Sequence, residues 1–129
     1  MNQSDKAGFE QLHKRACEAG AAAGAAAVPA PMIVGSPSTP FGTDVDPSQK
    51  MWYVSEGVCG FAWVHMDGRE PFARWAKGAG IGHKGYPKGW DIWVSYGGQS
   101  MQRKEAYAGA YARVLREAGI DCYVQSRMD

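Results

Sequence analysis

The sequence predicts an α+β fold: a ferredoxin-like βαββαβ sandwich, with two helices on one face of a four-stranded antiparallel sheet. The main observation is that segments with strand and helix character follow one another in the order β-α-β-β-α-β between residues 57 and 126. The second is that all five Trp and all six Tyr lie after residue 50, so most of the large side chains that a core requires are there. In this plan the first and third strands are central.

The first strand and first helix are predicted from composition and turn residues. Residues 57–66 (GVCGFAWVHM) are apolar and rich in aromatic side chains, which is typical of a strand. Residues 67–68 (Asp-Gly) turn the chain, and Pro71 suits the first helical position, where no backbone N–H is needed. The apolar residues that follow have helical spacing, and Gly78 or Gly80 ends the helix.

The second half of the unit begins with a hairpin. Residues 81–86 form a short second strand, residues 87–89 (Pro-Lys-Gly) form its turn, and residues 90–96 (WDIWVSY) form the third strand. Ser100 caps a long helix that ends at Gly119, and residues 121–126 form the last strand. One face of the long helix is continuous and carries Tyr107, Ala108, Tyr111, Val114, Leu115 and Ala118.

The N-terminal part of the chain has a different character. Ser4 is the expected N-cap of a short helix, which we expect to fray in an Ala/Gly run at Gly20 and Gly24. Five prolines between residues 28 and 48 forbid a continuing helix and favour an extended arm. The predicted organisation is a short helix and Ala/Gly-rich run over residues 1–27, a Pro-rich extended arm over 28–51, and the ferredoxin-like domain over 52–129.

Composition excludes several classes of protein. Fourteen Lys and Arg against thirteen Asp and Glu give a net charge of +1, which excludes a strongly basic protein that wraps nucleic acid. No window approaches ~18 consecutive strongly apolar residues, so the sequence predicts no transmembrane helix. Three cysteines are too few for a disulfide framework and indicate reduced thiols. The Ala/Gly run is too weakly hydrophobic for a secretory signal.

The residues that can carry chemistry predict no catalytic, cofactor or metal site. Neither the three histidines nor the three cysteines have metal-ligand spacing. Cys59 or Cys122 can approach His65 across neighbouring strands, but a cysteine in a strand is more often a small buried hydrophobic residue. Residues 97–103 open a helix and can hold an anion, although capping is the preferred interpretation. We therefore expect no enzymatic activity.

Alternation along the central strands divides their side chains between two faces. The helices need a smooth apolar floor, which Ala62, Val64, Ile92 and Val94 provide. The opposite face then carries Phe61, Trp63, His65 and Trp93. A bare aromatic patch of this kind marks an interaction face. Three occupants remain open: the arm folded back over the sheet, a protein partner, or single-stranded nucleic acid stacked on the rings.

A basic rim is the second candidate feature. Seven basic residues against three acidic ones make residues 66–104 locally positive. The rim consists of Arg74, Lys77, Lys84, Lys88, Arg103 and Lys104. A cluster of this size is usually solvated, and the third strand lacks the RNA-recognition string. Nucleic acid therefore stays open as a partner but is less favoured than a protein partner or a homo-oligomer.

The strings CGFAWV, KGWDIWVSYGGQS, KEAYAGAYARVLREAGI and the terminal SRMD resemble a group of short proteins encoded by tailed bacteriophages. The resemblance begins near residue 34, reaches the C-terminus and carries no functional residues across. It implies a bacteriophage protein of the virion or the host cytoplasm. With the arm and the aromatic face, it favours a non-enzymatic, virion-associated structural or cementing protein. The alternative is an intracellular module that binds single-stranded nucleic acid or a host or defence protein during infection.

Overall fold

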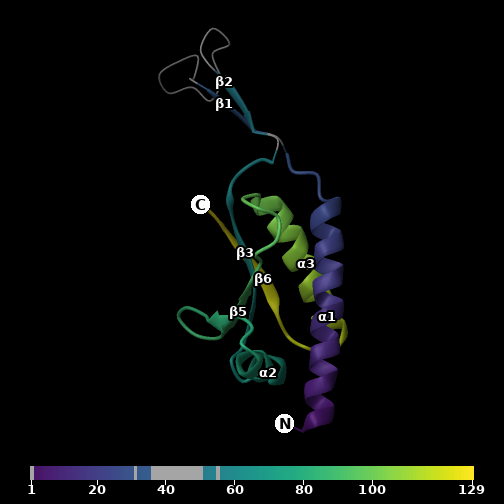
Figure 1. The fold of residues 1–129 in the computed structure, drawn as a ribbon. Helices are drawn as coiled ribbons and strands as arrows, with labels where there is room; N and C mark the ends of the chain where they lie inside the picture. The colour runs from purple at the N-terminus through teal and green to yellow at the C-terminus, as the bar shows by residue number, and fades with distance from the viewer. Residues whose placement is uncertain (1, 31, 36–50, 55) are drawn as a thin grey trace.

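The computed structural model describes residues 2–30, 32–35, 51–54 and 56–129. Along the chain, the helices and strands are α1 (Gln3–Ala26), β1 (Met32–Gly35), β2 (Met51–Val54), β3 (Gly60–Met66), α2 (Pro71–Ala79), β4 (His83–Lys84), β5 (Trp90–Trp93), α3 (Met101–Glu117) and β6 (Tyr123–Met128). The predicted α+β class is confirmed. Figure 1 shows the larger sheet with α3 beside it and α1 outside α3.

The larger sheet contains four antiparallel strands in the order β4-β5-β3-β6. Trp63 of β3 lies directly opposite Trp93 of β5, and Phe61 lies on the same face two residues earlier. The intervening β3 residues are at most 1% exposed and pack against the helices: Ala62, Val64 and Met66. The prediction that the three aromatic residues share the face opposite the helices is therefore confirmed.

The predicted helices and caps of the sheet region are largely confirmed. Pro71 is the first residue of α2, and Gly80 ends it in the left-handed conformation at φ +76°. Ser100 caps α3, and its side chain accepts a hydrogen bond from the backbone N–H of Arg103 at 3.3 Å. The second strand, β4, has only two residues, and the last strand, β6, begins and ends two residues later than predicted.

The N-terminal helix was predicted too short. α1 is continuous for 24 residues, and its N-cap is Asn2 rather than Ser4. The Asn2 side chain accepts a hydrogen bond from the backbone N–H of Asp5 at 2.8 Å. Leu12 and Ala16 are buried in the same core as the sheet and α3. The folded body therefore includes α1 and does not begin at residue 52.

Gly20 and Gly24 do not interrupt α1, because each one makes room for an aromatic ring. A Cβ atom on Gly20 would lie 2.8 Å from the ring of Tyr107, and one on Gly24 would lie 2.5 Å from the ring of Tyr96. Glycine costs a helix about 1 kcal/mol relative to alanine. Here the close approach of the two tyrosines offsets that cost, and the glycines are packing positions.

The arm is partly regular. β1 and β2 pair with each other in an antiparallel two-stranded sheet, with Met32 opposite Val54. We call this pair the β1–β2 ribbon. Figure 1 shows the ribbon beyond the end of the four-stranded sheet, so these strands do not lie across the aromatic face. Phe41, an apolar residue of the predicted arm, lies outside the described residues. Within the described residues, no helix is long and apolar enough to span a membrane.

Candidate functional site

The face of the sheet opposite the helices carries a contiguous aromatic group. The indole rings of Trp63 and Trp93 stack with their centroids 4.6 Å apart and 8° between their planes. The ring of Phe61 lies 5.5 Å from that of Trp93. All three side chains are half-buried. We call this surface the open face, because the helices of the described chain pack on the other side of the sheet.

The last strand completes the open face, and sequence reasoning missed its contribution. Gln125 lies opposite Trp63, and its side-chain oxygen accepts a hydrogen bond from the Trp63 indole N–H at 2.8 Å. The guanidinium of Arg127 lies 5.5 Å from the Phe61 ring centroid and 5.7 Å from that of Trp93. An arginine over aromatic rings is a cation–π arrangement. Alternation along β6, beginning with Tyr123, is the signal that could have revealed it.

His65 lies on the open face as predicted, but its ring is already engaged. Its Nδ1 is 2.5 Å from a carboxylate oxygen of Asp91, which stands opposite it on β5 and is buried. The His65 ring also lies 5.2 Å from that of Tyr123. A buried carboxylate is costly without a hydrogen-bonding partner, and His65 provides one for Asp91. The pair therefore stabilises the pairing of β3 with β5 at the border of the open face.

Two members of the predicted basic rim are not on a rim. Arg103 donates to a carboxylate oxygen of Glu56 at 2.6 Å and to the carbonyl oxygens of Gly24 and Ala27 at 2.9 and 3.0 Å. Those carbonyls are at the C-terminal end of α1, where a helix lacks internal donors. Arg103 therefore caps α1, and it could not be recognised as a cap until α1 was known to end there.

Lys104 is the second exception, because it is only 6% exposed. Its ammonium donates to the carbonyl oxygen of Gly60 at 3.1 Å and lies 5.1 Å from the centroid of the Phe61 ring. Lys104 therefore anchors the first residue of β3 to α3. The four remaining rim residues are exposed, as predicted: Arg74, Lys77, Lys84 and Lys88.

The segment at residues 97–103 is a helix cap. The Ser100 hydroxyl donates to the carbonyl oxygen of Glu56 at 3.0 Å, and the backbone N–H of Met101 donates to the carbonyl oxygen of Val58 at 3.1 Å. The backbone N–H of Arg103 also donates to the Ser100 hydroxyl oxygen. An anion bound at this helix N-terminus would need these same N–H donors, which are already used within the chain. The geometry thus agrees with the capping interpretation.

A second cluster was not foreseen. The suggested approach of Cys59 or Cys122 to His65 is not found. Cys122 lies in the core, and its thiol donates to the carbonyl oxygen of Ala112 at 3.6 Å. Instead, His13 and Cys17 meet on α1, with 3.5 Å between the His13 Nε2 and the Cys17 Sγ. Their spacing of four residues on a helix is the signal that could have shown it.

The His13–Cys17 cluster is partly buried. His13 Nδ1 lies 2.7 Å from the hydroxyl oxygen of Tyr111. Burial lowers the pKa of His13, so its imidazole is neutral at pH 7. Burial and a side-chain hydrogen bond to Cys17 raise the pKa of Tyr107 to about 12. Burial also raises the pKa of Tyr111.

No known protein family, curated protein or solved structure matches this chain. Within the described residues, no group of three or more His, Cys, Asp or Glu side chains is placed to hold a metal ion.

The lowered pKa of His13 predicts a pH-dependent stability. Because its pKa in the folded chain lies below the ordinary value of 6.5, the unfolded chain binds the proton first as the pH falls. The stabilising contribution is complete above that value and is lost below it. We expect a lower Tm at about pH 5 than at about pH 7.5, with a smaller difference in His13→Gln. Equal differences in the two proteins would contradict this assignment.

Proposed function

We propose that the chain is a non-enzymatic interaction protein that binds a partner protein through the open face. The observation that carries this proposal is the stacked pair Trp63 and Trp93, bordered by Phe61 and Arg127 and left uncovered by the described helices. Aromatic residues and arginine are enriched at the centres of protein interfaces. Because the rings are already packed together, binding requires little further ordering of side chains.

A ferredoxin-like arrangement of residues 57–129 is part of this proposal. It is supported by the order β3-α2-β4-β5-α3-β6 along the chain and by the central position of β3. A fold of this kind leaves one sheet face free of its two helices. The additional helix, α1, packs on α3 and leaves the open face available.

Two observations favour a protein over single-stranded nucleic acid. Trp63 and Trp93 stack on each other, which occupies ring surface that a base would need. Arg103 and Lys104 are committed to contacts within the chain, so fewer cations remain for phosphates than the sequence suggested. The open face therefore suits a partner surface with an apolar centre, which would pack on the aromatic rings. An acidic residue at the margin of that surface would pair with Arg127, which borders the rings.

The biological setting that we propose is a bacteriophage particle, in which the chain has a structural or cementing role. This follows from the resemblance to proteins of tailed bacteriophages together with two surfaces on one chain. The open face is the first, and the β1–β2 ribbon, which extends beyond the sheet, is the second. A protein that holds neighbouring subunits together needs at least two contact surfaces, because avidity depends on simultaneous engagement.

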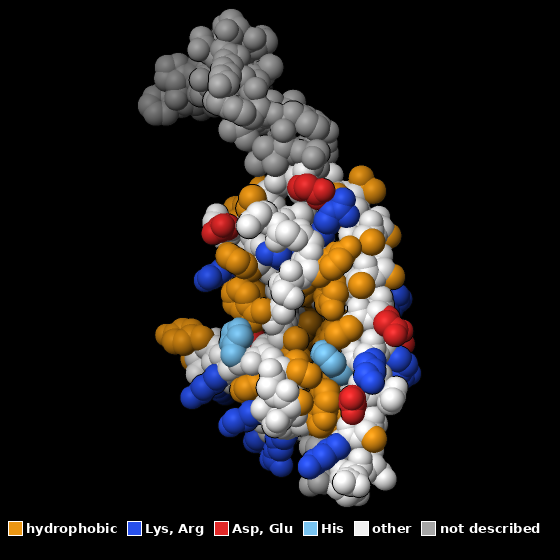
Figure 2. Space-filling view, in the orientation of Figure 1, with side chains coloured by type: hydrophobic (Ala, Val, Ile, Leu, Met, Phe, Trp, Pro, Cys, Tyr) orange, Lys and Arg blue, Asp and Glu red, His pale blue; other side chains and the backbone are white. Residues whose placement is uncertain are grey.

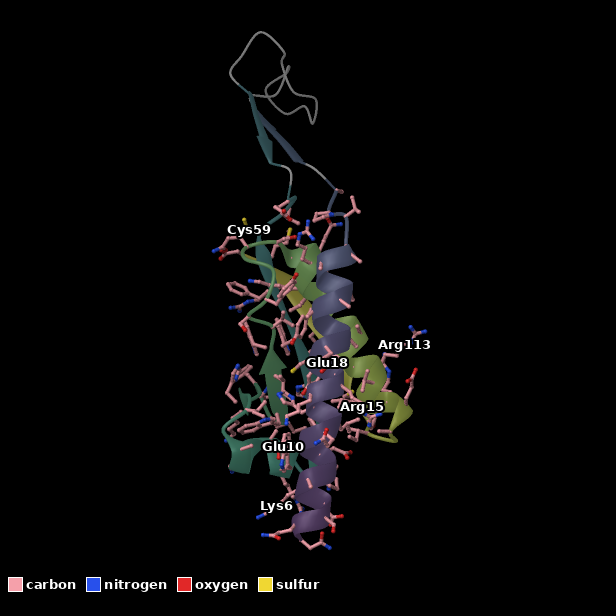
Figure 3. The ribbon with its side chains drawn as sticks, turned by 45° about the vertical axis from the view of Figure 1, so that its right-hand side comes forward. Lys6, Glu10, Arg15, Glu18, Cys59 and Arg113 are labelled. Carbon is pink, nitrogen blue, oxygen red and sulfur yellow. The ribbon has the colours of Figure 1, made fainter. Side chains whose placement is uncertain are left out.

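The test compares two arginine substitutions in phage particles. Arg127 belongs to the open face, whereas Arg113 projects from α3 away from the sheet, where it pairs with Glu117 at 3.7 Å (Figure 3). We expect quantitative mass spectrometry of purified particles to detect the chain. We expect Arg127→Glu to lower its particle-bound amount about tenfold or more, equivalent to about 1.4 kcal/mol, and Arg113→Glu to leave it unchanged.

Two results would contradict the proposal. Particles without the chain would exclude the virion role, and equal incorporation of both variants would exclude the open face as the contact. A fluorescence titration with single-stranded oligonucleotide at low salt addresses the alternative. We expect no quenching at micromolar concentration. A salt-sensitive quench that is lost in Trp63→Ala would instead favour a nucleic-acid module.

A further inference from the structure

A cavity of about 420 Å³ lies where α1, α3 and the β5 side of the sheet meet. Figure 2 shows hydrophobic side chains gathered between α1 and the sheet, with histidine side chains beside them. The side chains with polar atoms that line the cavity are His13, Cys17, His83, Trp93, Ser95, Tyr107 and Tyr111. The volume falls within the range of roughly 300–1,000 Å³ that is common for small-molecule sites.

The cavity contains a nucleophile, a base and a group that orients the base. Cys17 Sγ is 3.5 Å from His13 Nε2, and His13 Nδ1 is 2.7 Å from the Tyr111 hydroxyl oxygen. When Nδ1 carries the imidazole proton and donates to Tyr111, Nε2 is free to accept the thiol proton. A thiol paired with an oriented base is the arrangement that nucleophilic chemistry requires.

The lining also restricts the ligand. It includes no Asp, Glu, Lys or Arg, and its remaining side chains are apolar, among them Val64, Ile81 and Ile92. An ion would lose its hydration in such a cavity without gaining a charged partner. The cavity therefore suits a small uncharged molecule with an apolar body.

We propose that Cys17 is the nucleophile of a covalent binding site for small uncharged α,β-unsaturated carbonyl compounds. In the reaction, the sulfur forms a bond to the β-carbon as the carbon–carbon π bond breaks, and that electron pair moves to the carbonyl oxygen as an enolate. His13 Nε2 takes the thiol proton and returns it to the α-carbon. The addition has no leaving group and requires no oxidant or reductant. The cavity shares Trp93 with the open face, whereas the proposed reaction uses Cys17, His13 and Tyr111.

The chain supplies its own control thiols. Cys59 is exposed and lies at the end of the sheet near the β1–β2 ribbon (Figure 3). Cys122 is buried, and burial raises the pKa of its thiol to about 11. Exposure alone would make Cys59 the most reactive thiol. The proposed site instead predicts that the half-buried Cys17 reacts first with a suitable electrophile.

The experiment follows alkylation of the folded full-length protein by peptide mapping with mass spectrometry. With N-phenylmaleimide, a neutral cyclic α,β-unsaturated carbonyl compound, we expect Cys17 to react about tenfold faster than Cys59 and Cys122 to stay unmodified. With iodoacetate, which is anionic, we expect Cys59 to react first. His13→Gln is expected to slow the Cys17 reaction about tenfold and to leave the Cys59 rate unchanged.

The proposal is overturned if Cys59 reacts faster than Cys17 with both reagents. It is also overturned if His13→Gln leaves the ratio of the two rates unchanged. Should Cys122 become reactive in His13→Gln, that variant has lost its fold and Tyr111→Phe decides, because it removes only the hydroxyl. A Cys17 rate several-fold lower in Tyr111→Phe, with Cys122 still protected, supports the proposal, and an unchanged rate overturns it.

Discussion

Phe72→Ala is expected to lower the free energy of unfolding by about 3–5 kcal/mol. Phe72 is fully buried on α2, and its ring centroid lies 5.6 Å from that of Phe9 on α1 and 5.3 Å from that of Trp75. Removing the ring leaves a cavity between two helices and the sheet. Urea denaturation followed by tryptophan fluorescence measures the loss.

The control for Phe72→Ala is Tyr86→Ala in the β4–β5 hairpin. Tyr86 is 95% exposed, so its removal is expected to change the free energy of unfolding by no more than about 0.5 kcal/mol. Equal losses in the two variants would show that Phe72 does not lie in the core. A change in the denaturant slope of either variant would indicate an altered unfolded state instead.

Ala16→Leu is expected to destabilise the protein by about 1–3 kcal/mol, because Ala16 is fully buried in the shared core, on the α1 helix that packs along α3. The matched control is Ala22→Leu, the same substitution on an exposed position of the same helix. Thermal unfolding of both variants measures the difference. If both variants melt at the same temperature, α1 does not pack on α3.

The sheet and α3 could be predicted because their signals are local. Alternation along β3 places Ala62 and Val64 under the helices and Trp63 on the open face, whatever the rest of the chain does. Ser100 begins α3 through a hydrogen bond to a backbone N–H three residues later. Gly80 ends α2 through its left-handed backbone conformation. Such features need no knowledge of tertiary packing.

The full length of α1 could not be predicted in this way. Its Ala/Gly run has little hydrophobic surface, and its stability as part of the body depends on rings from distant parts of the chain. The ring of Tyr107 packs against Gly20, and the ring of Tyr96 packs against Gly24. Nothing within the run indicates these partners, so a local analysis interprets the glycines as breaks. Tertiary packing supplies most helical stability in proteins, and α1 depends on it.

The candidate site was predicted in part for the same reason. Phe61, Trp63 and Trp93 follow from alternation on two strands, whereas Arg127 required the register of β6. Arg103 was assigned to a solvated rim because its carboxylate partner is 47 residues away in sequence. Charge counts report how many cations a segment has, but their availability depends on partners that only the fold brings near.

The Arg103 contacts have a consequence for how the chain can diversify. Ala27 precedes the β1–β2 ribbon and Glu56 follows it, and Arg103 binds both. Gln102 adds a contact to the backbone N–H of Ala30 at 2.6 Å. Residues of α3 thus hold together the two ends of the segment that carries the β1–β2 ribbon. Because doubling a loop's length costs only about 0.6 kcal/mol, we expect the folded body to tolerate replacement or lengthening of that segment.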